Sequence, residues 1–447
     1  MEVQNRIDEI RNEIAITDVE GLMPKNHLLR KAEKAINWNK IYDILEPYYC
    51  KDNGRPCCDP VMLVKMVFIQ HIYGIKSLRQ TVQDIEVNIA YRWFLGLGFY
   101  STIPHFSTIS YAFRHRFTSE TTEEIFTLIL ERAYQKGYLK TDNIFIDSTH
   151  IKANANKKKF SRLAAEQQAK VYTAELRREI DEDREEHDKK PLKDNDDDET
   201  PTKEVKVSTV DPDCGVFHKG EHKIEMAYLA HTACDKNNFI LDFELTAANV
   251  HDSTVFDKVY DKVTKRFDNI EVVAVDAGYK TPWICKKIID DGKIPSMPYK
   301  RPMGKTGFFR PHEYIYDEYY DCIICPENEV LKYSTTNRDG YKEFKSNPQI
   351  CKNCPSRSKC THSKSFQKVV NRHVWQNYLE QAEDIRHSPL GKESYALRSQ
   401  TIERVFADAK EKHAMRYTFY RGLSQVTNWV RLKYAAMNLK KLAVWAW

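Results

Sequence analysis

Three carboxylates in the sequence have neighbours that suggest a shared chemical role. Asp147 closes a strand-like run of β-branched and aromatic residues at 144–146, and Asp276 closes a second such run at 272–275. Glu403 lies in a helix-like segment near the C-terminus. Two acids at strand ends and a third on a late helix are what a two-metal phosphoryl-transfer site requires, because paired metals clamp the attacking and leaving oxygens of a phosphodiester. Magnesium suits this set, since it prefers carboxylates, water and substrate phosphate.

Each acid also has a simpler interpretation. An Asp after a strand often caps a turn or the next helix, and Glu on a helix is usually an ordinary surface charge. The combination favours metal binding, because the two Asp positions occur together and the third acid follows in order. Apolar neighbours place Glu403 at the edge of buried surface, and Lys410, about two turns later, falls on nearly the same helix face.

These segments resemble the three catalytic blocks of the DDE transposases of bacterial insertion sequences. The blocks are found at 145–154, 275–279 and 403–406, in the order typical of the family. The last block also resembles the Tyr-Arg-Glu-Lys signature of one large branch, whose positions are occupied here by Tyr395, Arg398, Glu403 and Lys410. Four residues separate Arg398 from Glu403, whereas the usual signature has three. The resemblance extends from about residue 25 to about residue 440.

The resemblance implies a function, a cofactor and partners. The protein would bind the inverted terminal repeats of its element, hydrolyse a phosphodiester to free a 3′-OH, and join that end to target DNA. Asp147, Asp276 and Glu403 would hold two Mg²⁺ or Mn²⁺ ions. Double-stranded DNA would be the partner, and a homodimer is expected on it because two ends must be paired. Tyr395, Arg398 and Lys410 would contact DNA phosphates.

Two other functions compete with this one. An RNase H-like nuclease would cut nucleic acid without strand transfer, and a domesticated DNA-binding protein would have no catalysis. The presence of Asp147, Asp276 and Glu403 argues against the second. Strand-transfer products would distinguish the first.

Length, charge and hydropathy narrow the class of protein. A chain of 447 residues exceeds a single core. The net charge is only +5, but the segment 403–441 contains nine Lys and Arg against three Asp and Glu, which suits a polyanionic substrate. The first residues have no apolar signal core, and no run approaches the roughly 18 apolar residues of a membrane span. We therefore expect a soluble, cytoplasmic protein that does not enter a membrane.

Residues 1–140 predict a helical region. Asp59 and Pro60 form a helix start, Gly74 ends that helix, and Ser77 opens the next one with a capping-box pattern. A third helix is expected from Ser107 and would carry Arg114 and Arg116. Short helices with tight turns are compatible with a helix-turn-helix reader of DNA, to which Arg114 and Arg116 would contribute. The alternative is a helical bundle that only docks on the catalytic core.

Residues 141–300 predict the first part of an α/β, RNase H-like core. Three strands, a helix, a strand and a helix follow in that order, with the helix after the third strand capped by Asp252 and running over 253–266. In such a core the first and fourth strands are adjacent, which would bring Asp147 and Asp276 together. The interval 157–205 interrupts it as a charged insertion, expected to form a solvated helix over 163–180 and then a disordered loop. Residues 391–447 would complete the core with the Glu403 helix and a basic tail.

Residues 301–390 predict a cysteine-rich, metal-binding insertion. Its five cysteines include two C-x-x-C pairs about 25 residues apart, a spacing that suits tetrahedral Zn²⁺ held by four of the five thiolates. An alternative set of four omits the first cysteine and could hold zinc or an iron–sulfur cluster. Five unliganded thiols are the remaining possibility. The five residues are Cys322, Cys325, Cys351, Cys354 and Cys360.

Aromatic and basic side chains alternate near the C-terminus. Such a mixture can stack bases and hold the phosphates of a distorted DNA end, and Arg421 is the DNA-contact candidate here. A helix that packs its aromatics on the core explains Trp429 equally well. The residues concerned are Tyr417, Phe419, Tyr420, Arg421, Trp429, Arg431 and Lys433.

Overall fold

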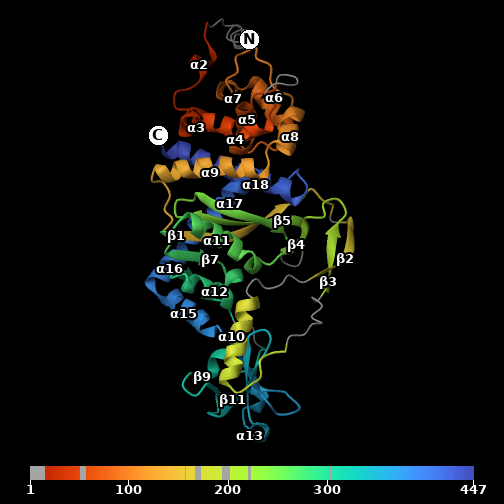
Figure 1. The fold of residues 1–447 in the computed structure, drawn as a ribbon, viewed down its shortest axis with the longest axis vertical. Helices are drawn as coiled ribbons and strands as arrows, with labels where there is room; N and C mark the ends of the chain where they lie inside the picture. The colour runs from red at the N-terminus through yellow and green to blue at the C-terminus, as the bar shows by residue number, and fades with distance from the viewer. Residues whose placement is uncertain are drawn as a thin grey trace, which may run out of the picture.

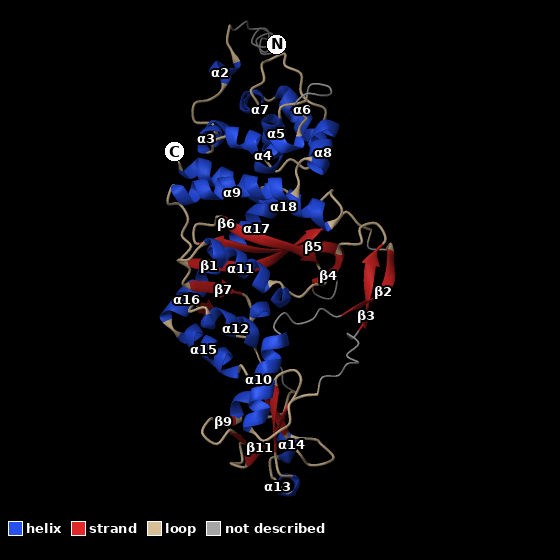
Figure 2. Ribbon diagram, in the orientation of Figure 1, coloured by secondary structure: helices blue, strands red, loops and turns tan. Residues whose placement is uncertain are grey.

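The computed structural model describes residues 16–50, 57–156, 158–166, 173–193, 202–219, 223–301 and 305–446. The molecule is elongated, with a layer of helices at the N-terminal end, a six-stranded sheet in the middle and a smaller five-stranded sheet at the other end (Figure 1). Helices and strands are mixed in the middle layer, whereas the N-terminal end is purely helical (Figure 2). Within the described residues, no helix combines the length and the apolar character needed to cross a bilayer.

Local signals in the N-terminal helices act as predicted. The Asp59 carboxylate accepts hydrogen bonds from the backbone N–H groups of Val61 and Met62, and α5 begins at Pro60. The Ser77 hydroxyl accepts from the N–H of Gln80 at the start of α6. The helices of this region are α2 (Val19–Leu22), α3 (Leu28–Ala35), α4 (Asn39–Leu45), α5 (Pro60–Ile72), α6 (Leu78–Val87), α7 (Ile89–Phe94), α8 (Phe106–His115) and α9 (Ser119–Gln135), with a 3₁₀ turn η1 (Glu46–Tyr48).

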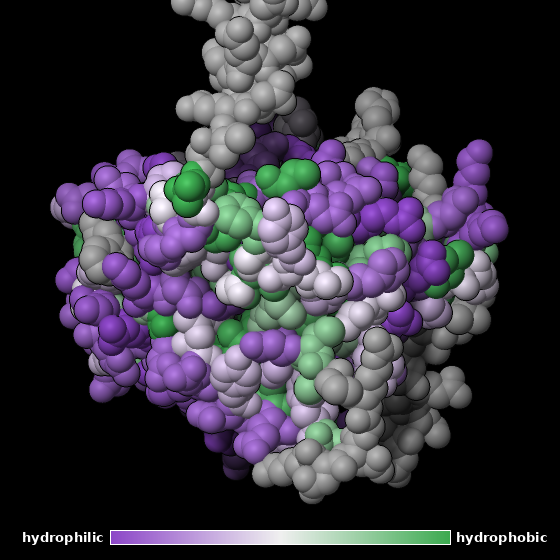
Figure 3. Space-filling model, turned by 90° about the horizontal axis from the view of Figure 1, so that it is seen from above, coloured by the Kyte–Doolittle hydropathy of each residue, from purple (hydrophilic) through white to green (hydrophobic). Residues whose placement is uncertain are grey.

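The predicted third helix is shifted slightly. It is α8, which begins at Phe106 because the His105 side chain accepts the N–H of Ser107 and so caps the helix. Arg114 lies inside this helix, whereas Arg116 is its C-cap residue. From the N-terminal end, hydrophilic side chains surround smaller hydrophobic patches on this layer (Figure 3).

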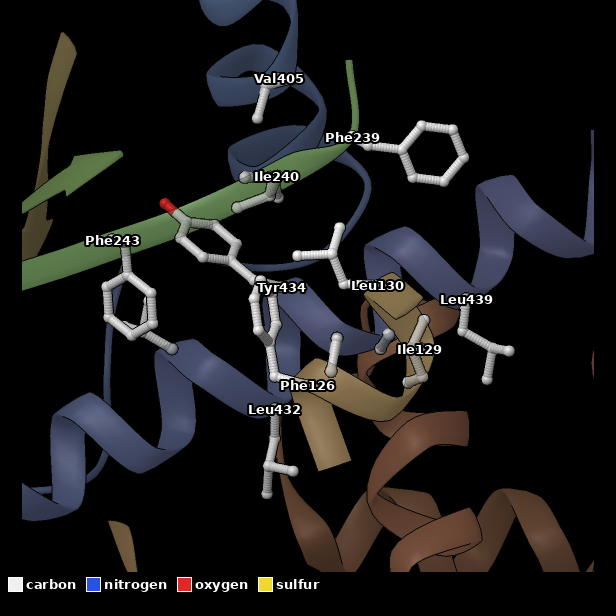
Figure 4. Close-up of a cluster of buried hydrophobic side chains, with 14 of the residues drawn as sticks. Phe126, Ile129, Leu130, Phe239, Ile240, Phe243, Val405, Leu432, Tyr434 and Leu439 are labelled. Carbon is white, nitrogen blue, oxygen red and sulfur yellow. The ribbon is translucent and has the colours of Figure 1, made fainter. Parts of the chain in front are cut away.

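The last helix, α18 (Leu423–Trp445), joins the N-terminal helices to the sheet. It packs against α3, α5 and α9 on one side and against strand β6 (Ile240–Ala247) on the other. Its residues are buried around much of its circumference, as expected for a helix inside a core. Figure 4 shows Tyr434 of α18 among Phe126 and Leu130 of α9 and Phe243 of β6. The Tyr434 hydroxyl satisfies its hydrogen bond with Thr232 at 2.9 Å.

The central sheet has the order β4-β5-β1-β7-β8, and β6 also pairs with β5. β5 is antiparallel to β1, β4 and β6, while β7 is parallel to both β1 and β8. The predicted neighbours therefore do lie side by side as β1 and β7. The strands are β1 (Asn143–Lys152), β4 (Gly215–Lys219), β5 (Lys223–Asp235), β6, β7 (Val272–Val275) and β8 (Ile294–Ser296).

Helices flank this sheet. They are α11 (Phe256–Arg266), α12 (Pro282–Asp290), α15 (Gln376–His387), α16 (Pro389–Ala396) and α17 (Ile402–Glu411), together with the 3₁₀ turns η2 (Asp252–Thr254), η3 (Ala277–Tyr279) and η5 (Leu397–Gln400). α15 packs on α12 and β8, and α16 packs on β7 and β8. The chain thus returns to the central sheet before residue 390, where the sequence analysis placed the end of the insertion.

The charged insertion differs from its prediction. The helix predicted over 163–180 begins later, as α10 (Thr173–Glu186). The first residues of the predicted range belong instead to β2 (Phe160–Glu166), which forms a hairpin with β3 (Thr202–Ser208). α10 is not simply solvated, since Leu176 and Ile180 are buried against Trp375. Part of the predicted disordered loop, residues 194–201, lies outside the described residues.

Polar contacts fasten α10 to the five-stranded sheet. Arg184 donates to the Thr335 hydroxyl at 2.7 Å and to the Thr336 carbonyl at 2.9 Å. The buried Asp183 carboxylate pairs with Lys342 at 2.5 Å. This sheet has the order β13-β12-β11-β10-β9. Its elements are η4 (Pro311–Glu313), β9 (Ile315–Asp317), β10 (Cys322–Ile324), β11 (Val330–Thr336), β12 (Tyr341–Lys345), α13 (Pro348–Lys352), α14 (Arg357–Cys360) and β13 (Val369–His373).

We expect Leu176→Ala to lower the free energy of unfolding by about 2–5 kcal/mol, because it leaves a cavity beneath a buried helix face. Arg178→Ala, on the exposed face of the same helix, should change it by less than about 0.5 kcal/mol. Urea denaturation of the two variants measures the difference. Equal midpoints would mean that α10 contributes no packing to the fold.

Candidate active site

Two strands bring the Asp147 and Asp276 carboxylates together. β1 and β7 run parallel, with Ile146 paired to Val275, so the acid that follows each residue lies at the same level of adjacent strands. Asp147 does not close its strand, however: β1 continues to Lys152 because β5 still pairs with it beyond the end of β7. Asp276 does end β7, and its carboxylate accepts the N–H of Gly278 at 2.8 Å.

Arg398 forms an ion pair with the Asp147 carboxylate. Its guanidinium donates to Oδ2 of Asp147 at 2.6 Å and to the carbonyl of Ile146 at 3.3 Å. The arginine is only 4 % exposed. It lies in η5, and Thr401, whose backbone is not helical, separates η5 from α17. The phosphate contact expected of Arg398 does not match this buried, paired position, which suits a residue that positions Asp147.

The Tyr395 hydroxyl is affected by the charges around it. Burial raises its pKa, the charge of Arg398 lowers it, and the charges of Asp276, Glu403 and Asp147 raise it further. Glu403 itself is exposed in the first turn of α17, and Lys410 is half-buried in the last turn.

The Asp147 carboxylate has both an opposite charge, Arg398, and a like charge, Asp276, nearby. Burial raises its pKa to about 6, with Arg398 opposing this shift and Asp276 adding to it. Oxygen donors from adjacent strands and a helix fit Mg²⁺ or Mn²⁺ in their chemistry. Among the residues that the structure describes, no three His, Cys, Asp or Glu side chains are already gathered tightly enough to hold a metal ion.

Asp252 is a further acid at this site, which the sequence favours as a helix cap over a chemical role for the His251-Asp252 pair. That prediction is wrong, since His251 accepts the N–H of Ser253 and caps η2 instead. The Asp252 carboxylate faces Nδ1 of the buried His231 at 3.4 Å. Burial raises its pKa, a hydrogen bond from Ser148 lowers it, and the charge of Asp276 raises it. The adjacent His251-Asp252 pair was the signal available in the sequence.

We expect Arg398→Ala to destabilise the DNA-free protein by about 3–5 kcal/mol, because it leaves a buried carboxylate without its partner. Adding Asp147→Asn should recover part of this loss, since the uncompensated charge is then removed. Thermal or urea unfolding of the single and double variants, without DNA, measures both effects. An arginine that only contacts DNA phosphate would leave DNA-free stability unchanged.

The structure exposes some of the basic residues predicted to contact DNA and buries others. Arg114 and Arg421 are exposed and line one concave surface between α5, α6 and α8 and the segment 414–433, which we call the basic groove. Arg116 lies instead over the ring of Tyr49, at 4.0 Å from its centre. In the basic tail, Arg431 and Lys433 are buried within α18 and are not surface charges.

Four of the five insertion cysteines line one small enclosed cavity of about 30 Å³. They are Cys325, Cys351, Cys354 and Cys360. Cys322 is not among them and lies in β10. Burial raises the pKa of the Cys360 thiol, and its neighbours Cys351 and Cys325 raise it further. This arrangement matches the alternative ligand set, although these thiols are not gathered as metal ligands in the described structure.

Comparisons with known proteins match two separate segments. Residues 17–116, which contain Arg114 and Arg116, match the family described as Transposase domain (DUF772). Residues 324–443, which contain the four cavity cysteines and Glu403, match the family described as Transposase DDE domain. No curated protein and no solved structure matches the chain. Asp147 and Asp276 lie outside both matched segments, and the two matches together support a transposase function.

Proposed function

We propose that the protein is the transposase of a bacterial insertion sequence. It binds the terminal inverted repeats of its element, cleaves DNA at the element ends and joins those ends to target DNA. Asp147, Asp276 and Glu403 are the catalytic residues. The main support is the position of Asp147 and Asp276 at the same level of adjacent parallel strands.

The strand arrangement supports an RNase H-like core for this reaction. Leaving aside β4, the order is β6-β5-β1-β7-β8, in which the first three strands along the chain are antiparallel and the last two are parallel to β1. The sequence predicted one part of this order, the adjacency of the first and fourth strands, which are β1 and β7. Active sites of open α/β sheets lie at strand ends, as the acids do here at the end of β7.

Two successive phosphoryl transfers account for the products. Water oxygen first bonds to phosphorus as the bond from phosphorus to the 3′ oxygen breaks, leaving a 3′-OH and a 5′-phosphate. That 3′ oxygen then attacks a target phosphodiester and releases a target 3′-OH, so one ester replaces another and no oxidant is needed. Asp147, Asp276 and Glu403 would hold two Mg²⁺ or Mn²⁺ ions, which supply Lewis acidity to the oxygens when bound.

The remaining side chains of the site bind DNA or position the catalytic acids. Arg398 holds Asp147. Tyr395, and Lys410 in the same helix as Glu403, are proposed to contact the scissile strand. Arg114 and Arg421 contact DNA through the basic groove, and most of the affinity is expected to come from such phosphate contacts. Pairing two element ends requires at least a dimer of the protein on DNA.

The five-stranded sheet is proposed to hold a structural metal. Thiolates favour zinc or iron over magnesium, and Cys325, Cys351, Cys354 and Cys360 offer four of them around one cavity. Among the residues that the structure describes, the buried hydrophobic cluster of this sheet is small and consists of Ile323, Leu331 and Phe344. A metal would supply folding energy that this cluster lacks.

Incubation with DNA tests the function. Purified protein is mixed with Mg²⁺, a plasmid that carries the inverted repeats flanking its own coding sequence, and a supercoiled target. We expect nicked or cleaved element ends and joined products on a gel. Cleavage without joined products would favour the nuclease, and end binding without cleavage would favour a non-catalytic DNA-binding protein.

A further inference from the structure

The basic groove has the size of a small-molecule site. Its cavity volume is about 550 Å³, within the range of pockets that enclose a compact ligand. One wall comes from the end of α5, the start of α6 and α8, and the other from residues 414–433, with Asn154 between them. A double helix does not fit in such a volume, whereas a single nucleotide does.

The rim of the groove is positively charged. Lys76, Arg79, Arg114 and Arg421 are exposed at it, and no Asp or Glu is among the described lining residues. The Arg421 guanidinium donates to the Asn154 carbonyl at 3.1 Å, which fixes it at the junction of the two walls. These cations suit the phosphates of a nucleic-acid strand.

Aromatic rings line the groove below this rim. Phe106 lies under the Arg79 guanidinium, at 4.9 Å from the ring centre. On the other wall Tyr417 and Phe419 meet edge to face at 4.9 Å, and Phe419 is 59 % exposed. An exposed ring beside cations is a stacking platform for an unpaired base.

The floor contains polar atoms that have no partner. Nζ of Lys433 and Nδ1 of His71 are 3.3 Å apart, so this ring nitrogen already has a hydrogen-bond partner. Nε2 of His71 and Oε1 of Gln425 are buried and make no hydrogen bond within the described part of the chain. His71 is 1 % exposed. Polar atoms left unpaired beside a cavity are destabilising until a ligand supplies their partners.

The floor is also less charged than the rim. Burial lowers the pKa of Lys433 to about 7 and keeps His71 neutral by lowering its pKa well below the usual value. An uncharged group with hydrogen-bonding edges therefore suits the floor better than a phosphate does. Every nucleobase has such edges.

We propose that the basic groove binds one unpaired nucleotide of the DNA substrate, with its base against Phe419 and over His71 and Gln425, and its phosphates on the rim arginines. The proposal rests on the proposed DNA-binding function, but it requires neither metal nor cleavage. DNA that enters the groove must expose an unstacked base, so the protein prefers DNA with a local unpaired position.

Fluorescence anisotropy in EDTA tests this with three labelled duplexes of one length and sequence: fully paired, with a one-nucleotide bulge, and with an abasic bulge. We expect the full-length protein to bind the base-bearing bulge at least about tenfold more tightly than either other duplex. Phe419→Ala should bring the ratio of the dissociation constants close to one. Tyr100→Ala removes a fully exposed ring outside the groove and should keep the ratio.

Three results would overturn the proposal. Equal affinity of the wild-type protein for paired and bulged DNA would exclude an unpaired-nucleotide site. Equal affinity for the abasic bulge would show that the groove binds phosphate alone, and an unchanged ratio in Phe419→Ala would place the site elsewhere. Because these measurements need no cleavage, an inactive protein that still prefers the bulge would contradict only the catalytic function.

Discussion

Asp147→Asn, Asp276→Asn and Glu403→Gln are each expected to reduce DNA cleavage by at least about 10²- to 10³-fold, since each removes a negative oxygen worth several kcal/mol of transition-state stabilisation through the metals. Binding to the element ends should change little, because affinity depends mainly on basic groups and phosphates. Gel assays of cleavage and anisotropy of end binding separate the two quantities.

Matched controls for these variants lie on the same or neighbouring segments. Glu411→Gln changes an exposed acid at the other end of α17, where it pairs with Arg416, and Asp268→Asn changes an exposed acid in the loop before β7. Both should cleave DNA at nearly the wild-type rate. Substantial Mg²⁺-dependent cleavage by any of the three active-site variants would remove that residue from the proposed catalytic set.

Cys351→Ser and Cys354→Ser are expected to release a tightly bound metal and to loosen the five-stranded sheet. Purified wild-type protein should retain about one zinc or iron ion per chain through gel filtration, since structural thiolate sites contribute about 10–16 kcal/mol of apparent binding energy in small zinc domains. Elemental analysis measures the metal, and proteolysis within residues 305–375 measures the loosening.

Cys322→Ser is the control for the ligand set. Cys322 lies in β10, outside the cavity that the other four cysteines line, so this variant should keep the metal. Loss of metal from Cys322→Ser with retention in Cys360→Ser would select the two C-x-x-C pairs instead. Absence of both zinc and iron in protein prepared under reducing, metal-replete conditions would leave the cysteines as ordinary thiols.

Features that depend on neighbouring residues could be predicted from the sequence. The caps at Asp59 and Ser77 act within three residues, and the hairpin between β5 and β6 follows from a short polar turn between apolar runs. The adjacency of Asp147 and Asp276 was also predictable, because strand order constrains which strand ends meet.

Features that depend on distant partners could not be predicted from the sequence. Arg398 pairs with Asp147 across 251 positions, so its buried position could not be inferred from the signature spacing. The sequence of α10 predicts a solvated charged helix, but in the folded protein Trp375 covers Leu176. The sequence places Lys433 in a basic tail, but Lys433 is buried because α18 lies between the N-terminal helices and the central sheet.

The sequence by itself determined the helix starts at Asp59 and Ser77 and the strands that carry Asp147 and Asp276, because helix caps, turns and strand patterns are local. The tertiary structure alone decided which charges are buried, which four cysteines share a cavity, and that Asp252 faces His231 instead of capping a helix. The physical reason is that burial and ion pairing depend on what packs against a side chain, and that is set by segments far away in the chain.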